Sequence, residues 1–224
     1  MELLAFARGP ALIFALAIFV TGIGWRLFVI FRRPAGVDHS APRGGSPLHG
    51  ALRAIATRMW PYRTFRERSF AATLNAYAYH IGLAIVFFGF APHIAFVTRL
   101  TGAAWPAVPG WLFVIAVGLV FIGLITALVA RLGSPVLRLL SSFDDYASWV
   151  VTILPMITGM ALLSLPLEAT YPPVPLDPSP VAVHLLSVEL LLVVLPFSKL
   201  SHAFLVFASR GVTGARLARR GAAF

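Results

Sequence analysis

Five long apolar stretches follow one another along the chain, separated by short polar or basic connections. Each approaches the roughly 20 residues that an α-helix needs to cross a hydrocarbon core of about 30 Å. We therefore predict an all-α integral membrane protein, a bundle of five transmembrane helices that forms one membrane domain over residues 1–224. The predicted spans are approximately residues 10–31, 71–97, 110–130, 146–165 and 181–207.

Composition leads to the same class of protein. The chain has 59% hydrophobic and 12% charged residues, and its mean hydropathy is +0.87. A chain of this composition has too few polar residues to cover the surface of a soluble domain. It contains no cysteine. Disulfides, cysteine-ligated iron–sulfur clusters, thioether-linked haem and a thiol nucleophile are therefore excluded within this chain.

The arginines indicate an orientation. Eight lie in residues 32–70, two in 131–145 and four in 210–220, all on one side of a chain with five spans. The other side has only Arg8 and Arg99. The positive-inside rule then places the amino terminus outside and the carboxyl terminus in the cytoplasm, in the cytoplasmic (inner) membrane of the cell.

The same asymmetry accounts for the net charge of +10. Loop 32–70 and tail 208–224 are both predicted to be cytoplasmic, where basic residues attract anionic lipids. A nucleic-acid partner is not needed to explain the charge. Within the loop, the run GALRAIATRMWPYRTFRERS mixes basic and apolar residues, which indicates a segment that lies on the membrane surface.

Four of the six histidines lie inside predicted spans: His80 and His93 in the second, His184 and His202 in the fifth. An imidazole in hydrocarbon is costly unless it is paired, and axial ligation of haem iron would explain all four. The alternative is that these are hydrogen-bonded interior histidines, or two ligands and two bystanders.

Chain direction suggests how the four would pair. The second span runs outward and the fifth inward, so His80 and His202 fall toward the cytoplasm and His93 and His184 toward the outside. Each level then offers one imidazole per helix, as a b-type haem with two histidine ligands requires. The remaining two, His39 and His49, lie in the first cytoplasmic loop and are expected to be solvated.

Helical spacing supports the two pairs unequally. On a continuous helix, the 18 residues from His184 to His202 make five turns, so both would share one face about 27 Å apart. The 13 residues from His80 to His93 would leave their side chains about 140° apart. Pro92 is a plausible place for a kink that re-aims His93.

Two glycines in the second span, Gly82 and Gly89, are seven residues apart and share a helix face. Small residues there would let a flat macrocycle approach the helix backbone. The alternative for glycines in membrane helices is close helix packing.

Three runs of sequence suggest a family: YHIGLAIVFFGFAPHIAF, SPVLRLLSSFDDYASWVVTILPMITG and HLLSVELLLVVLPFSKLSHAF. Over nearly its whole length the chain resembles the membrane gamma subunit of respiratory nitrate reductases and its relatives in sulfite-reductase- and heterodisulfide-reductase-like complexes. The resemblance implies two b haems, an inner one held by His80 and His202 and an outer one held by His93 and His184.

The resemblance also implies a function. In that family, quinol is oxidised near the outer haem and electrons pass inward to an iron–sulfur subunit on the cytoplasmic face. Two alternatives stay open. The same haems would serve a quinone reductase if electrons flowed in reverse, and a non-redox membrane anchor or proton-coupled transporter would contain no haem.

Three further ionisable residues are candidates for this chemistry. Glu189 lies deep in the fifth span, where a bare carboxylate is expensive. It is either a proton acceptor for quinol or a buried acid bonded to a hydroxyl such as that of Ser187 or to a neighbouring helix. Arg26 and Lys199 lie near the inner ends of their spans. They would either pair with the propionates of the inner haem or extend toward the membrane interface.

Overall fold

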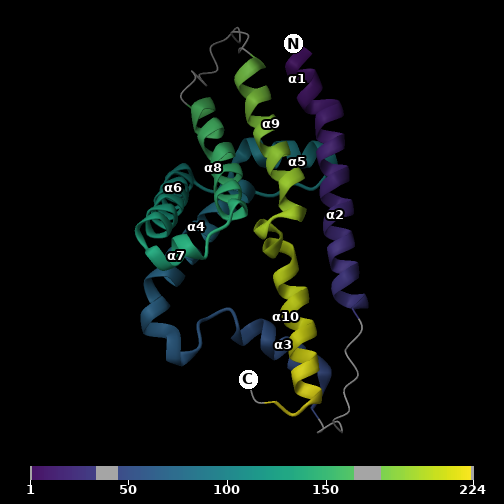
Figure 1. Ribbon diagram of the computed structural model, residues 1–224. Coiled ribbons are helices and arrows are strands. Elements are labelled where there is room, and N and C mark those ends of the chain that lie inside the picture. The colour runs from purple at the N-terminus through teal and green to yellow at the C-terminus, as the bar shows by residue number, and fades with distance from the viewer. Residues whose placement is uncertain (1, 34–44, 164–177, 223–224) are drawn as a thin grey trace. The chain divides into compact units, whose positions relative to one another are not determined.

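The computed structural model describes residues 2–33, 45–163 and 178–222, and within these ranges every regular element is a helix. Five helical stretches of the described residues are long and apolar enough to cross a membrane, which confirms the predicted number: Glu2–Arg32, Arg63–Gly89, Gly110–Gly133, Phe143–Leu163 and Ser179–Phe197. The elements in order (Figure 1) are α1 Glu2–Phe6, η1 Ala7–Ala11, α2 Leu12–Arg32, α3 Pro47–Thr57, η2 Arg63–Phe65, α4 Arg66–Gly89, α5 Ala91–Thr101, α6 Gly110–Gly133, α7 Pro135–Leu139, α8 Phe143–Leu163, α9 Pro178–Val194, η3 Leu195–Phe197, η4 Lys199–Ser201 and α10 His202–Arg219.

The first span begins earlier than predicted. The hydropathy pattern predicts a start near Pro10, but the helical stretch already begins at Glu2 and Pro10 lies inside it. Proline has no backbone N–H and its ring collides with the preceding turn of an α-helix. The helix passes this residue as one wider π-helical turn, η1, which connects α1 to α2.

The second span is interrupted where the sequence suggested a kink. Helix α4 ends at Gly89, Phe90 is extended (φ −81°, ψ 125°), and α5 begins at Ala91 with Pro92 in its first turn. Proline is well tolerated there because a first-turn N–H has no partner within the helix. His80 and His93 therefore lie on separate helices, and the 140° offset of a continuous helix does not apply to them.

The fifth span is not the continuous helix that was predicted over residues 181–207. After α9 come two short 3₁₀ turns, η3 and η4, separated by Ser198 in an extended conformation (φ −107°, ψ 177°). Pro196 cannot donate the next helical hydrogen bond, and the Ser198 hydroxyl accepts one from the N–H of Leu200. The shared face inferred for His184 and His202 was therefore wrong, since it required an unbroken helix.

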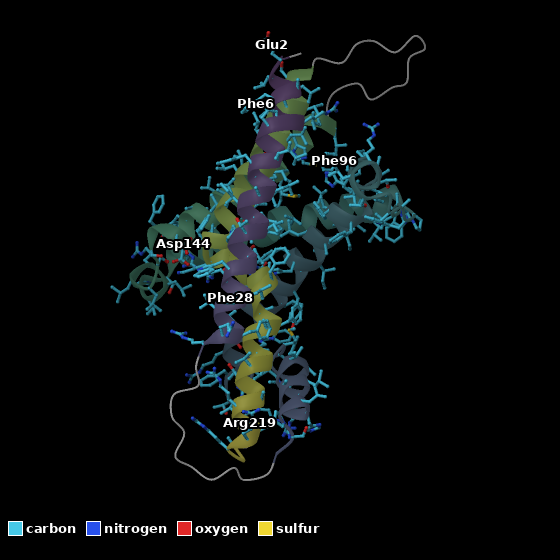
Figure 2. The ribbon with its side chains drawn as sticks, turned by 90° about the vertical axis from the view of Figure 1, so that its right-hand side faces the viewer. Glu2, Phe6, Phe28, Phe96, Asp144 and Arg219 are labelled. Atoms are coloured by element: carbon cyan, nitrogen blue, oxygen red, sulfur yellow. The ribbon has the colours of Figure 1, made fainter. Side chains whose placement is uncertain are left out.

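The chain divides into two compact units, Met1–Tyr62 with Val150–Phe224 and Arg63–Trp149. In the first, the N-terminal helix packs along α9, and α10 packs on α2 and α3. Figure 2 shows Phe28 on α2 alongside the C-terminal helices, with Glu2 and Arg219 near opposite ends of this unit. Helix α2 also approaches η3 closely at Gly22, because a Cβ on Gly22 would lie 2.6 Å from Cβ of Pro196.

The segment predicted to lie on the membrane surface, residues 50–69, is not one helix. Residues 50–57 belong to α3, which Figure 1 shows beside α10, and residues 63–69 form η2 and the first turn of α4. Gly50 faces Gly214 so closely that a Cβ on Gly50 would lie 2.5 Å from the main-chain oxygen of Gly214. Leu48 and Leu52 of α3 remain 69% and 59% exposed. Helix α3 therefore has one face committed to α10 and another that is apolar and uncovered by the described residues.

In the second unit, α4 packs along α6. A Cβ on Gly123 would lie 2.5 Å from Cβ of Tyr79, and Asn75 donates a hydrogen bond to the carbonyl of Gly123 at 2.9 Å. The turn after α6 is held by an ion pair of 3.1 Å between Arg131 and Asp145.

Candidate functional site

The four span histidines lie on four different helices. His80 is on α4 and His93 on α5, both in the unit Arg63–Trp149, whereas His184 on α9 and His202 at the start of α10 belong to the other unit. His80 and His202 are exposed in the protein, and His93 and His184 are partly buried. His39 lies outside the described residues.

Three of these imidazoles bond through Nδ1 to a main-chain carbonyl. The acceptors are the oxygen of Ala76 for His80 at 2.7 Å, of Val86 for His93 at 3.0 Å, and of Lys199 for His202 at 2.7 Å. A carbonyl oxygen only accepts, so Nδ1 carries the hydrogen. In the neutral ring Nε2 then has the lone pair, which is the tautomer seen when a histidine binds a metal through Nε2.

His93 reaches its acceptor across the break between α4 and α5. The last carbonyls of a helix lack hydrogen-bond donors within that helix. At the end of α4, donors from the segment that follows bond to these carbonyls. The ring of His93 donates to the carbonyl of Val86. The indole N–H of Trp105 donates to the carbonyl of Phe88 at 2.5 Å, and the N–H of Val108 donates to that of Gly89 at 2.9 Å. The orientation of His93 is thus tied to the way in which α4 ends.

His184 is held by side chains of α8. Its Nδ1 lies 3.1 Å from the hydroxyl of Thr158, which in turn donates to the carbonyl of Leu154 at 3.0 Å and so can accept the imidazole hydrogen. A Cβ on Gly159 would lie 3.1 Å from Cε1 of His184, so glycine leaves room for the ring against α8. Sequence analysis missed both residues, although a Thr-Gly pair within an apolar span was a signal.

Arg26 lies at the break in the fifth span. Its guanidinium donates to the carbonyl of Pro196 at 3.0 Å. The main-chain carbonyl of Lys199 accepts the hydrogen bond from Nδ1 of His202, and the side chain of Lys199 is exposed. Both residues therefore lie close to the segment that positions His202.

Glu189 on α9 is 5% exposed, and neither carboxylate oxygen has a hydrogen-bond partner among the described residues. The predicted alternative of a bond to Ser187 is not observed: that hydroxyl donates to the carbonyl of His184 at 2.6 Å and lies 2.9 Å from the hydroxyl of Thr158. A buried carboxyl without a partner is costly. It is the most unusual polar group of this unit.

Glu189 is one of the residues that line an open apolar groove of about 490 Å³ between the N-terminal helix and α9, although its two carboxylate oxygens are themselves buried. Both elements belong to the same unit. The groove runs past the π-helical turn η1, and its other lining residues are Phe6, Pro10, Ala11, Phe14, Ala15, Leu186, Leu190 and Val193.

The two glycines of the second span contact protein. A Cβ on Gly82 would lie 2.8 Å from the carbonyl oxygen of Ala116, and one on Gly89 would lie 2.8 Å from a methyl group of Val108. These are the close contacts of helix packing, one of the two roles considered for them.

Among the described residues no group of three or more histidine, cysteine, aspartate or glutamate side chains is gathered as for a metal ion. A haem iron with two axial histidines needs only two side chains, because the porphyrin supplies the other four nitrogens. The donor set relevant to haem is therefore the imidazoles and their tautomers.

Comparison with known proteins gives one relative and no function. A protein of Nitratidesulfovibrio vulgaris strain Hildenborough, described only as a protein, is 29% identical over 224 residues, which cover 94% of this chain and 91% of the relative. The two chains thus correspond over nearly their whole lengths. No family model matches this sequence. No solved structure matches it either.

Proposed function

We propose that this chain is a di-haem cytochrome b subunit of a membrane oxidoreductase complex, which oxidises quinol and passes electrons to a cytoplasmic iron–sulfur partner. One observation supports this most directly. All four span histidines bond through Nδ1 to an oxygen, as histidines that bind a metal through Nε2 commonly do. The resemblance to nitrate reductase gamma subunits leads to the same proposal.

The residues present fit the group. His80 and His202 would hold an inner haem and His93 and His184 an outer one. When bound, haem b would supply one-electron transfer. The protein fixes the imidazole tautomers through carbonyl and hydroxyl acceptors.

Quinol oxidation releases two electrons and two protons as two O–H bonds break. The haems that the four span histidines would hold would accept the two electrons one at a time. Glu189 is the proposed acceptor of one proton, and the other goes to water at the outer surface. Because its carboxyl has no hydrogen-bond partner in the described part of the chain, proton exchange at Glu189 would disrupt no hydrogen bond seen there.

The wider setting follows from the sequence. We place the protein in the cytoplasmic membrane with its amino terminus outside, and its arginine-rich face against anionic lipid and the iron–sulfur subunit. The absence of cysteine means that such clusters would belong to the partner.

The test is the haem content of the purified full-length protein. We expect a reduced-minus-oxidised b-type spectrum and about two haems per chain, as the four axial histidines require. His202→Ala should remove the inner haem and leave the outer one. His49→Ala is the matched control, since His49 is an exposed histidine of α3. A colourless wild-type preparation would reject the proposal and favour an anchor or a proton-coupled transporter.

The direction of electron flow has its own measurement. Quinol oxidation requires haem potentials between those of the quinone pool and the partner's clusters, in the order that carries electrons inward. The reverse order would make the chain a quinone reductase. Redox titration of the haems in the complex distinguishes the two.

A further inference from the structure

We infer that the turn between the third and fourth spans, residues 134–143, is an anchor in the membrane interface. It bonds its polar atoms internally and inserts apolar side chains among the lipids of the adjoining leaflet. The partner of this surface is lipid, and not a soluble protein. The inference does not depend on the proposed haem chemistry, because the residues that carry it lie in the unit Arg63–Trp149 and outside the candidate site.

The first argument is the exposure of large apolar side chains in this turn. Four of them follow one another at intervals of three or four residues and are mostly exposed: Val136 64%, Leu139 86%, Leu140 70% and Phe143 86%. Contiguous exposed apolar patches mark contacts with another protein or with a membrane. The turn therefore presents a surface that is suited to an apolar medium.

The second argument is that the hydroxyl groups of the turn bond within the protein. The Ser134 hydroxyl accepts from the N–H of Leu137 at 3.3 Å. The Ser141 hydroxyl donates to the carbonyl of Leu137 at 2.6 Å and accepts from the guanidinium of Arg131 at 2.7 Å. These contacts join the two ends of α7 to each other and to the last turn of α6.

The carboxylate beside the turn is paired in the same way. The side chain of Asp145 is 7% exposed, and its Oδ1 lies 3.1 Å from Nη1 of Arg131. Its Oδ2 accepts from the N–H and the hydroxyl of Ser142 at 2.9 and 3.1 Å. Polar groups need such internal partners where water is scarce. The turn has these polar atoms inside and its apolar side chains outside, the reverse of a turn built for water.

The third argument is the depth at which the turn lies. Residues 134–142 are the whole connection between the spans Gly110–Gly133 and Phe143–Leu163, and α7 packs back on the end of α6 (Figure 1). A helix of five residues is about 7.5 Å long, and the headgroup layer on each side of a bilayer is about 5–7 Å thick. The turn therefore stays at the interface.

The fourth argument identifies lipid as the contact. Exposed apolar side chains already run along α6 toward the turn at helical spacing, at Ile122, Ile125, Val129 and Leu132. In a helix that crosses a membrane such a stripe faces hydrocarbon, and the turn continues it. Arg138 is exposed among the apolar residues of the turn, where its guanidinium can extend to lipid phosphates as basic residues of interfacial segments do.

The experiment places single nitroxide spin labels in the full-length protein in lipid nanodiscs. The chain contains no cysteine, so one introduced cysteine takes one label. The test variants are Leu139→Cys and Phe143→Cys. Ile122→Cys is the reference for hydrocarbon, and Ala222→Cys, exposed beyond the last helix, is the reference for water. Collisions of the label with oxygen report hydrocarbon, and collisions with a neutral nickel chelate report water.

We expect the ratio of oxygen to nickel collisions at Leu139 and Phe143 to be several-fold higher than at Ala222 and close to that at Ile122. A ratio equal to that at Ala222 would show that the turn lies in water and would overturn the inference. Loss of collisions with both reagents, in the protein alone or in its assembled complex, would show that protein covers the patch and would also overturn it.

A further variant tests whether the internal polar contacts present the apolar side chains to lipid. In the Leu139→Cys background, Arg131→Gln removes the cation from Asp145 and should lower the collision ratio several-fold, because the released carboxylate draws the turn toward water. Arg99→Gln is the matched control, since Arg99 is an exposed arginine of the same unit, and should leave the ratio unchanged.

A ratio that Arg131→Gln does not lower would contradict the role of these contacts in holding the anchor. The labels at Leu139 and Phe143 in the otherwise native sequence decide the depth of the turn whether or not Arg131→Gln folds.

Discussion

The imidazole Nδ1 of His93 lies 3.0 Å from the carbonyl oxygen of Val86, seven residues earlier and on the other side of a helix break. The same ring that is proposed to hold a haem thus also completes the C-terminal end of α4. This contact links the position of a ligand to the local fold. It makes His93 the most informative of the four histidines to replace.

We predict that His93→Ala removes the outer haem and retains the inner one. The replacement also leaves the Val86 carbonyl without this donor, which costs about 1 kcal/mol of unfolding free energy or somewhat more. Haem stoichiometry and thermal unfolding of the purified protein measure the two effects. Loss of neither haem, or of both, would contradict the pairing of His93 with His184.

Thr158→Val should disturb the outer haem without removing a ligand. Valine keeps the shape of threonine and removes the hydroxyl that lies 3.1 Å from Nδ1 of His184. Loss of a hydrogen bond that orients a metal-binding histidine typically costs about 10–100-fold in metal affinity, so we expect partial loss of the outer haem or a shift of its potential.

Thr21→Val is the matched control for this variant. Among the described residues, the hydroxyl of Thr21 bonds to two carbonyls of its own helix, those of Ala17 at 2.6 Å and Ile18 at 3.3 Å. Its removal should leave both haem potentials as in the wild type. An equal change in the two variants would mean that Thr158 acts through general stability.

The sequence was sufficient for the number of spans, because continuous apolar length is a signal that does not depend on tertiary contacts. The structure differs at the prolines. Pro10 lies within a π-helical turn, Pro92 is in the first turn of a new helix, and Pro196 lies within the first of two 3₁₀ turns. Hydropathy is the same for each of these outcomes, so it could not distinguish among them.

In the candidate site, the sequence likewise predicts some features and not others. Imidazoles and a carboxyl within apolar spans stand out in a sequence because burying them is costly. The partners that orient them do not stand out, since Val86 contributes only a carbonyl and Thr158 lies on another helix. The unsatisfied state of Glu189 likewise depends on which residues surround it.

Gly82→Ala should destabilise the packing of α4 on α6. The added Cβ would lie 2.8 Å from the carbonyl oxygen of Ala116, a main-chain atom that moves only with its helix. We expect a loss of about 1–3 kcal/mol in unfolding free energy, as for other overpacked sites. Gly118→Ala in α6 is the control, because its Cβ would meet nothing within 4 Å. Equal stability of the two variants would contradict the close contact.

Arg26→Met tests what the guanidinium does at the break in the fifth span. It donates to the carbonyl of Pro196 at 3.0 Å, where the main chain leaves the helical hydrogen-bond pattern. Methionine retains much of the apolar stem of arginine and removes the hydrogen-bond donor. We expect the free energy of unfolding to fall by about 1–3 kcal/mol. We expect faster amide exchange over residues 194–202.

Arg8→Met, an exposed arginine of the same span, serves as the control and should leave that exchange unchanged. The experiment also separates the two roles of Arg26. A guanidinium that pairs mainly with a haem propionate would, when lost, lower the potential of the inner haem while amide exchange at the break stayed as in the wild type, because removing a nearby positive charge destabilises the reduced haem. Faster exchange with an unchanged potential assigns Arg26 to the fold of the segment that carries His202.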